Sequence, residues 1–263
     1  MNELLAPAKL NLALIVGPIR PDGKHEVATV LQRITLADSV ALESSRALEI
    51  AGFSEDTIVR AALERLARAA GVEPAWKVHI HKQIPVAAGL GGGSSDAAAA
   101  LRLANSTLPS PLAEEDLHRI AAALGADVPF FLTEGPQLGE GDGTTLTPLD
   151  LPRDYWVVVV LPREIEKEST AAVYAAFDQP AGFEERRASL LRAVAVGDVA
   201  ALPSNDLVSS PLSRELVDRG AFRADVSGAG PAVYGLFSEE VEAVTAIAAI
   251  GDRGQTWLAT PAC

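Results

Sequence analysis

The sequence predicts an α+β protein that folds as two compact domains. Its 263 residues are more than one hydrophobic core usually needs, and 48% of them are hydrophobic, which suffices for ordinary globular folding. The second half mixes short apolar strands with amphipathic helices and shows no internal repeat. We expect an N-terminal domain over residues 1–152 and a C-terminal domain over 153–263, because a polar, proline-containing stretch at that point precedes an apolar strand.

Charge and composition argue against several classes of protein. The net charge of −13 opposes binding to nucleic acid or to an anionic membrane, so any anionic ligand must be captured locally. The longest apolar run, WVVVVL at 156–161, is the length of a buried strand and far too short for a membrane span. The N-terminus lacks the pattern of a signal peptide, and the single cysteine, Cys263, fits a reducing compartment. We therefore expect a cytoplasmic protein that binds neither nucleic acid nor a membrane, and whether it is a monomer or a homodimer is left open.

Strands and then helices are predicted along the first half of the chain. The stretch KLNLALIV at 9–16 has the pattern of a buried strand, and two prolines and two glycines at 17–25 predict a turn before further strand patterning. A helix is expected from Ser54 to Gly71, and a strand over 76–84. Another helix is expected over 110–125, with Ser110 as its cap and Pro111 at its first position.

The second half is expected to contain a four-stranded set with intervening helices. Alternating or continuous apolar residues predict its strands, and caps with helical spacing predict its helices. The expected strands are 156–161, 223–228, 232–237 and 256–260, and the expected helices are about 169–177, 183–196, 210–220 and 239–251.

A glycine-rich loop between a strand and an alanine-rich helix is the most informative stretch. The string GLGGGSSDAAAAL at 89–101 places four glycines and two serines directly before a run of good helix formers. A helix N-terminus exposes unpaired N–H groups, and glycines let the backbone approach a phosphate closely. A flexible loop before a capped helix would need fewer glycines. The pattern therefore predicts a phosphate-binding loop, with the helix starting near Ser94.

The longer string PVAAGLGGGSSDAAAAL resembles the nucleotide loop of the GHMP kinases. It lacks the Lys-Ser/Thr ending of a Walker A loop and fits a dinucleotide fingerprint only loosely. Two other motifs of the family occur in order, PAKLNLAL at 7–14 and DVSGAGPAVYGLF at 225–237. The resemblance implies ATP and Mg²⁺ as cofactors, a ribosomal-S5-like α/β N-terminal domain and a ferredoxin-like C-terminal domain. The ATP-binding residues that it implies are Pro85, Gly89, Leu90, Gly91, Gly92, Gly93, Ser94 and Ser95.

Four strings together are similar to one branch of this family. They are PAKLNL, DG-x-HE, GLGGGSSDAA and GADVPFFL. In this branch, ATP phosphorylates a hydroxyl on the methylerythritol end of a cytidine diphosphate ester, a step of non-mevalonate isoprenoid biosynthesis. The resemblance implies the same activity here.

Lys9 and Asp127 are the catalytic residues that the resemblance implies. Phosphoryl transfer needs positioning, charge neutralisation and a group that orients or deprotonates the hydroxyl. Lys9 stands between apolar positions on a predicted buried strand, where an unpaired charge is costly. A lysine beside Asp127 would keep its carboxylate ionised and hold the hydroxyl in line. Whether Asp127 takes the proton or only orients the nucleophile is left open, as are the protein ligands of Mg²⁺.

The substrate-binding residues are also implied by the resemblance. They are Asn11, Lys24, His25, Thr170, Tyr174, Gly228 and Gly230. The family string is usually Asp-Gly-Tyr-His, and here Lys24 replaces an aromatic residue that would stack on cytosine. This departure leaves two alternatives open: a different alcohol or phospho-sugar acceptor, and a ligand sensor without catalysis. Retention of Lys9 and Asp127 argues against the sensor.

Overall fold

The computed structural model describes residues 2–53, 57–163, 170–177 and 182–262. These residues form two compact units, and each unit is assembled from several segments of the chain. The first unit contains 1–8, 37–86 and 91–134, and the second contains 9–36, 87–90 and 135–263. The domain boundary expected between residues 152 and 153 stays a prediction.

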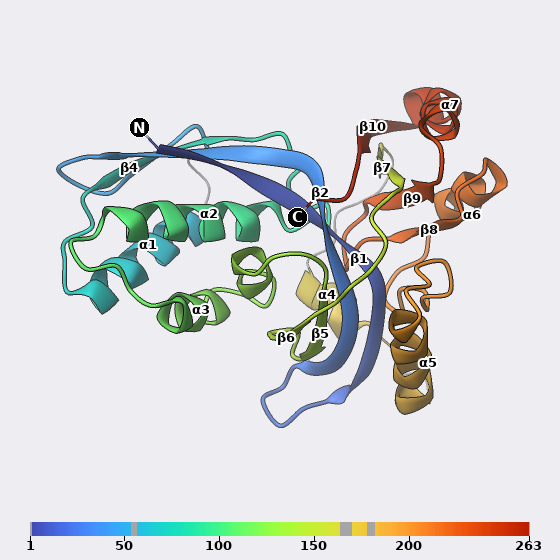
Figure 1. Cartoon of the computed structure of the whole chain (residues 1–263), viewed down its shortest axis with the longest axis horizontal. Coiled ribbons are helices and arrows are strands. Elements are labelled where there is room, and N and C mark those ends of the chain that lie inside the picture. The colour runs from blue at the N-terminus through green and yellow to red at the C-terminus, as the bar shows by residue number, and fades with distance from the viewer. Residues whose placement is uncertain (1, 54–56, 164–169, 178–181, 263) are drawn as a thin grey trace. The chain divides into compact units, whose positions relative to one another are not determined.

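The first unit combines paired strands with three helices. Its elements are the start of β1 (Asn2–Ile19), the end of β2 (His25–Ser44), β3 (Glu49–Ala51), α1 (Thr57–Ala70), β4 (Trp76–His81), α2 (Gly92–Thr107), α3 (Glu114–Ala122) and the 3₁₀ turn η1 (Pro129–Leu132). Strand β4 pairs antiparallel with β2 and parallel with β3. Helix α2 packs on β4, and α1 packs on α2 and α3 (Figure 1). The glycine-rich stretch lies between β4 and α2, and its last glycines form the first turn of α2.

Helix α3 begins three residues later than the sequence predicts. The expected cap was Ser110, but the observed N-cap is Ala113 and the helix begins at Glu114. The side chain of Asn105 binds the backbone of Leu112 on both sides, accepting from its N–H at 2.8 Å and donating to its carbonyl at 3.1 Å. These tertiary hydrogen bonds satisfy the backbone of Leu112 outside a helix. The helix therefore does not begin at the Ser110 cap that the local sequence predicts.

The second unit contains a four-stranded antiparallel sheet of ferredoxin-like order. Its strands are β7 (Trp156–Pro162), β8 (Arg223–Val226), β9 (Val233–Phe237) and β10 (Gly254–Ala259), arranged β10-β7-β9-β8. Its helices are α4 (Thr170–Ala175), α5 (Phe183–Ala195), α6 (Pro211–Asp218) and α7 (Glu240–Ile250), with a 3₁₀ turn η2 (Gly251–Arg253) before β10. Numbered within the sheet, the order is 4-1-3-2 with helices between strands, the split βαβ arrangement. The expected α+β class and ferredoxin-like part are confirmed.

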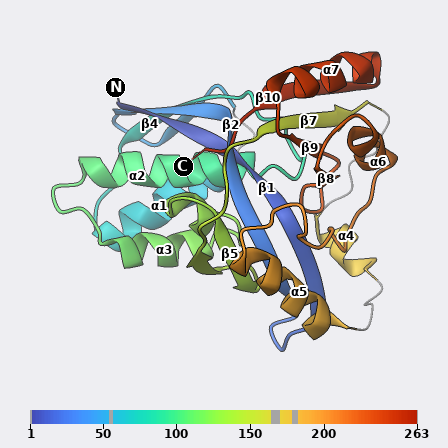
Figure 2. The ribbon, with the colours of Figure 1, turned by 45° about the vertical axis from the view of Figure 1, so that its right-hand side comes forward.

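Helices α6 and α7 cover one face of this sheet (Figure 2). Alternate strand residues such as Val158, Val160 and Val233 pack with Leu216 of α6 and Ala246 of α7 in one buried cluster. The residues between them on the strands point to the opposite face. That face carries Asp225 and Tyr234, which belong to the polar network described below.

Two long strands and a hairpin complete the second unit. Residues 9–19 of β1 and 25–36 of β2 belong to it, together with β5 (Gln137–Gly141) and β6 (Thr145–Pro148). Strand β5 pairs antiparallel with both β2 and β6. Among the described residues, the helices include none with the length and hydrophobicity of a membrane span.

Candidate active site

The glycine-rich loop leads into α2 earlier than the sequence predicts. Helix α2 begins at Gly92 rather than near Ser94, and its N-cap is Gly91, with φ of 70°. This left-handed conformation is open to glycine at little cost. The N-cap residue, Gly91, has no side chain that could bond the first turn, and the first N–H groups of α2 and the positive end of its dipole favour an anion at this end of the helix.

Ser95 is placed in the first turn of α2 with its hydroxyl buried. The residue is 1% exposed, and its Oγ has no hydrogen-bond partner among the residues that the structure describes. A buried hydroxyl without a partner is costly, so this atom calls for a ligand oxygen or a cation. Within the described residues, the glycine N-cap of α2 and the unpartnered Oγ of Ser95 thus fit a polyphosphate with its bound metal ion.

A buried ion triad lies next to this loop, and sequence reasoning missed it. Lys82 Nζ donates to Asp38 Oδ2 at 2.5 Å and to Asp96 Oδ2 at 2.6 Å, and both carboxylates are fully buried. Burial opposes the charge on Lys82, but the two hydrogen bonds outweigh it and raise the pKa of Lys82. The triad ties β2 and the residue after β4 to the first turns of α2. Nothing in the local sequence around Lys82 distinguishes it from a solvated lysine.

The first unit also contains Pro85 and Asp127. Pro85 is half-buried and precedes the loop. Asp127 is half-buried in the turn between α3 and η1, where the N–H of Val128 donates to the carbonyl of Gly125 at 3.2 Å. Lys9 falls in the second unit, so the pairing of Lys9 with Asp127 stays a prediction.

Lys9 and Asn11 project from the same face of β1 into the interior of the second unit. Both are buried at 4% exposure. Lys9 Nζ donates to Asn11 Oδ1 at 2.5 Å, and Asn11 Nδ2 donates to Thr29 Oγ1 at 2.8 Å. The hydroxyl of Thr29 donates onward to the carbonyl of Ala13. This chain of hydrogen bonds fixes the orientation of the Asn11 amide and holds the Lys9 ammonium at a defined point.

The start of the glycine loop packs tightly on the SGAGP turn after β8. A Cβ atom on Gly230 would lie 2.2 Å from backbone atoms of Ala88 and Gly89, and one on Gly89 would lie 2.1 Å from the carbonyl oxygen of Ser227. Ser227 Oγ donates to the carbonyl of Gly89 at 3.0 Å, and the N–H of Ala232 donates to the carbonyl of Ala88 at 3.1 Å. Only glycine fits at this approach of two backbones.

All three family motifs meet at this point of the second unit. The N–H of Lys9 donates to the carbonyl of Leu90 at 2.9 Å. A Cβ atom on Gly228 would lie 3.1 Å from Asn11 Oδ1 and 3.3 Å from Lys9 Nζ. The expected residues that the structure brings together here are Lys9, Asn11, Gly89, Leu90, Gly228 and Gly230.

A second group of expected residues surrounds His25. Its ring lies 5.7 Å from that of Tyr174 and 5.9 Å from that of Phe177, measured between centroids. His25 Nδ1 lies 2.9 Å from the carbonyl oxygen of Gly17. Because a carbonyl only accepts, Nδ1 carries the proton, which leaves Nε2 as the acceptor of the neutral ring. Phe177 was not expected at this site, although it follows Tyr174 by three residues, just after the end of α4.

Lys24 is paired with an acid that the sequence analysis did not consider. Its Nζ lies 2.6 Å from Asp142 Oδ2, in the turn between β5 and β6. Partial burial opposes ionisation of Asp142, but hydrogen bonds from Lys24 and Thr144 outweigh it and lower the pKa of Asp142 to about 2. Thr170 is the first residue of α4, and its side chain lies outside what the structure describes.

Comparison with known proteins gives consistent matches. Residues 57–135 match the family described as GHMP kinases N terminal domain. A protein from Geobacter sulfurreducens named 4-diphosphocytidyl-2-C-methyl-D-erythritol kinase is 39% identical, over 97% of this chain and 96% of that protein. The match therefore spans both halves of the chain.

Solved structures give the same result. A crystal structure of 4-(cytidine 5'-diphospho)-2C-methyl-D-erythritol kinase matches with a TM-score of 0.84 and 32% identity, covering 100% of both chains. A crystal structure of mevalonate kinase matches with a TM-score of 0.77 over 99% of both chains, and at 13% identity this likeness shows the fold alone.

Proposed function

The chain belongs to the GHMP kinase family, and from this premise we propose that it transfers the γ-phosphoryl group of ATP to a hydroxyl of 4-diphosphocytidyl-2-C-methyl-D-erythritol. The observation that carries the proposal is the meeting of the three motif segments around Lys9, Gly89 and Gly228. The near full-length relative of that name supports the choice of acceptor. The reaction belongs to non-mevalonate isoprenoid biosynthesis, and we propose that it takes place in the cytoplasm.

The glycine loop is the proposed site of the ATP phosphates. The N–H groups of Gly92 and Gly93 lie in the first turn of α2, where the helix dipole favours negative charge. Ser94 and Ser95 are the candidates to hold Mg²⁺, and the unpartnered Oγ of Ser95 supports that role. Asp96 is the weaker candidate because its carboxylate is already bound by Lys82. When bound, Mg²⁺ neutralises the charge that builds up on the polyphosphate.

Lys9 and Asp127 are the proposed catalytic pair. The ammonium of Lys9 is buried and held by Asn11 Oδ1, so its position is fixed before substrate arrives. A fixed cation next to Asp127 would favour the ionised carboxylate, which accepts a hydrogen bond from the acceptor hydroxyl and orients its oxygen. Most of the rate enhancement then comes from alignment and electrostatic stabilisation.

His25 and Tyr174 are proposed to bind the cytosine of the acceptor. With Nδ1 donating to Gly17, the Nε2 atom of His25 is free to accept a hydrogen bond from the base edge. The ring of Tyr174 offers a face for stacking beside it. We propose contacts with the rest of the acceptor for Asn11, Thr170, Gly228 and Gly230.

A different acceptor is the second candidate, and one observation favours it. Lys24 stands where the family has a tyrosine, and it pairs with Asp142, so one stacking face for cytosine is replaced by an ion pair. Such a site has less aromatic surface for a base and more charge for a polar group. This candidate keeps the proposed roles of the ATP loop, Lys9 and Asp127.

A coupled ADP-release assay with purified full-length protein tests the proposal. Reactions contain ATP, Mg²⁺ and one candidate acceptor: the cytidine diphosphate ester of methylerythritol, homoserine, mevalonate or a phospho-sugar. We expect ADP release with the ester at least about 100-fold above that with any other acceptor, as expected when a buried polar recognition site is matched. Turnover with another alcohol and none with the ester would overturn the proposed acceptor.

The variant Asp127→Asn separates an enzyme from a ligand sensor. It keeps the shape of the side chain but removes the charge, and we expect kcat to fall by about 100-fold or more. Asp150→Asn, a change in the linker between β6 and β7, serves as the control and should keep wild-type turnover. Wild-type turnover in Asp127→Asn would contradict the proposed mechanism.

A further inference from the structure

Asn205 is buried in the second unit, outside the three family motifs, and it contacts the SGAGP turn. It is 8% exposed. Its Nδ2 donates to the carbonyl of Gly228 at 2.6 Å and to that of Val226 at 3.0 Å. Its backbone N–H donates to Asp225 Oδ2 at 2.8 Å. One side chain thus satisfies carbonyls on both sides of Ser227.

The turn that Asn205 holds is in direct contact with the proposed catalytic groups. Ser227, between the two carbonyls, donates from Oγ to Gly89 and accepts from the N–H of Asn11 at 3.3 Å. Gly228 itself lies against Lys9 Nζ and Asn11 Oδ1. A shift of this turn would therefore move the start of the phosphate loop and the surroundings of Lys9 together.

The segment that carries Asn205 is held to β1 by hydrogen bonds of the neighbouring residue. The next residue, Asp206, bridges to β1: its N–H donates to the carbonyl of Leu14, and its Oδ2 accepts from the N–H of Val16, both at 2.9 Å. Arg186 lies 3.1 Å from the same carboxylate. The segment is thereby fastened to the strand that also carries Lys9 and Asn11.

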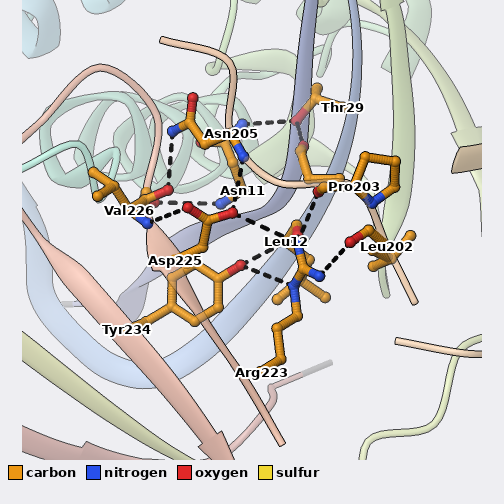
Figure 3. A network of polar contacts seen from close by, with 12 residues as sticks. Asn11, Leu12, Thr29, Leu202, Pro203, Asn205, Arg223, Asp225, Val226 and Tyr234 are labelled. Carbon is orange, nitrogen blue, oxygen red and sulfur yellow. Dashed lines mark hydrogen bonds and ion pairs between the residues drawn. The ribbon is translucent and has the colours of Figure 1, made fainter. Parts of the chain in front are cut away.

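A buried network below Asn205 fastens β8 to the same strand (Figure 3). Arg223 and Tyr234 both donate to the carbonyl of Leu12, at 2.5 Å and 3.1 Å. Arg223 also donates to the carbonyls of Leu202 and Pro203, just before Asn205. Asp225 pairs with Arg223 at 3.6 Å and receives the N–H of Asn205. These bonds join β1, β8 and the residues just before Asn205 in one buried network, so we expect a change in it to shift the turn.

We propose that Asn205 is a positioning residue, which sets the place of the Ser227–Gly230 turn and through it the alignment of Lys9 and the phosphate loop. This inference rests on the proposed function, since the alignment matters for phosphoryl transfer from ATP. Asn205 touches neither substrate nor a reacting atom in the proposal. Its effect runs through the carbonyls of Val226 and Gly228.

The oxygen and the nitrogen of the Asn205 amide bind different parts of the chain, so a substitution can remove one set of hydrogen bonds and keep the other. Oδ1 accepts from the N–H of Leu207 at 2.9 Å, a local turn contact, whereas Nδ2 makes both bonds to the SGAGP turn. Asn205→Asp keeps the local acceptor and removes both donors. A role in local folding alone predicts normal kcat in this variant, and a positioning role predicts a loss.

Asn105 provides a matched control in the first unit. It is also 8% exposed, and its side chain also binds the backbone through both amide ends, in this case to Leu112. Asn105→Asp removes one buried donor in the same way without touching the SGAGP turn. Any effect of general destabilisation should appear in both variants.

The experiment compares kcat, KM, thermal midpoint and ATP affinity of full-length wild type, Asn205→Asp and Asn105→Asp at a temperature at which all are folded. We expect kcat of Asn205→Asp to fall by about 100-fold, as for a misplacement of about 1 Å, while kcat of Asn105→Asp stays within threefold of wild type. Equal losses in both variants, or a kcat within threefold of wild type in Asn205→Asp, would overturn the inference. If Asn205→Asp does not fold, Ser227→Ala tests the next link, with an expected tenfold loss of kcat and an unchanged kcat as the contrary result.

Calorimetric titration with ATP alone separates this inference from the proposed function. If wild type binds ATP but does not turn over the ester, the proposed acceptor is wrong, and the inference is then judged by ATP affinity. We expect Asn205→Asp to bind ATP about tenfold more weakly than wild type, because the start of the loop is displaced, and Asn105→Asp to bind it normally. Equal affinity of Asn205→Asp and wild type would overturn the inference in that case.

Discussion

Lys24 Nζ lies 2.6 Å from Asp142 Oδ2, so the cation of Lys24 is held by an acid of the same chain. The two residues are far apart in sequence and meet because the turn between β5 and β6 lies next to the turn between β1 and β2. The Lys24 side chain is 58% exposed and that of Asp142 is 17% exposed. The pair therefore occupies the position at which the family string Asp-Gly-Tyr-His, implied by the resemblance, has an aromatic residue.

Replacing Lys24 with tyrosine should improve binding of the cytidine ester. A stacked base gains about 1–3 kcal/mol from an aromatic partner, so we expect KM for the ester to fall by about tenfold with kcat unchanged. Steady-state kinetics with the ADP-release assay measure both constants. Lys77→Tyr, at an ion-paired lysine of β4, is the control and should change neither. A KM that is unchanged or higher in Lys24→Tyr would show that the missing ring is not what limits recognition of the base.

The Lys24–Asp142 pair should stabilise the fold in a pH-dependent way. The pKa of Asp142 is lowered from 3.8 to about 2 in the folded state, so its contribution is full above about pH 5 and is lost progressively as pH falls from there through the folded pKa. Because Lys24 is largely exposed, we expect Asp142→Asn to lose about 1 kcal/mol of unfolding free energy at pH 6. Urea unfolding from pH 3 to pH 6 should show the two proteins converging at the acid end. A difference that stays constant with pH would contradict this account.

The contact between the SGAGP turn and the glycine loop should not tolerate a methyl group. Gly230→Ala forces a Cβ into backbone atoms of Ala88 and Gly89, and we expect a loss of about 3 kcal/mol in unfolding free energy. Gly125→Ala is the control, since its Cβ would meet only a side-chain atom of Val128 at 3.7 Å, an ordinary contact. Equal stability of the two variants in urea unfolding would mean that the close approach is absent.

Gly93 offers a separate test of phosphate binding by the loop. A Cβ there would meet only Ile58 Cδ1 at 3.6 Å, and alanine is the better helix former in the first turn of α2. We expect the unfolding free energy to stay the same or to rise by up to about 1 kcal/mol. ATP affinity should nevertheless fall about tenfold, because the methyl group would occupy space that phosphate oxygens need. Calorimetric titration with unchanged ATP affinity would contradict the proposed loop.

The motif residues could be predicted from the sequence because their roles depend on short-range backbone geometry. Four glycines before an alanine helix indicate a close approach of backbone to ligand, and the structure places Gly91 at the left-handed N-cap of α2. The order of strands and helices in the second half was also predictable, because each has its own period and caps. The exact start of a helix was less predictable. Helix α3 begins at Glu114 and not after Ser110, because Asn105, on another helix, binds the backbone between these two residues.

The supporting contacts could not be predicted, because they join residues that are distant in sequence. Lys82 resembles a surface lysine until β2 and α2 bring Asp38 and Asp96 to it. From the local sequence, Asn205 can be interpreted only as a capping residue in a loop. Its hydrogen-bond partners lie about twenty residues further along the chain. The sequence thus indicated which residues form the three motifs, whereas the residues that hold these motifs in place required the fold.

Phosphorus NMR of the reaction mixture tests the central claim most directly. Wild-type protein with ATP, Mg²⁺ and the cytidine diphosphate ester of methylerythritol should convert ATP to ADP and produce one new phosphomonoester resonance, with the diphosphate resonances of the ester retained. The same mixture with Asp127→Asn should remain unchanged over the time in which the wild-type protein consumes the ATP. Release of inorganic phosphate in place of a monoester, or no consumption of ATP by the wild-type protein, would contradict transfer to this acceptor.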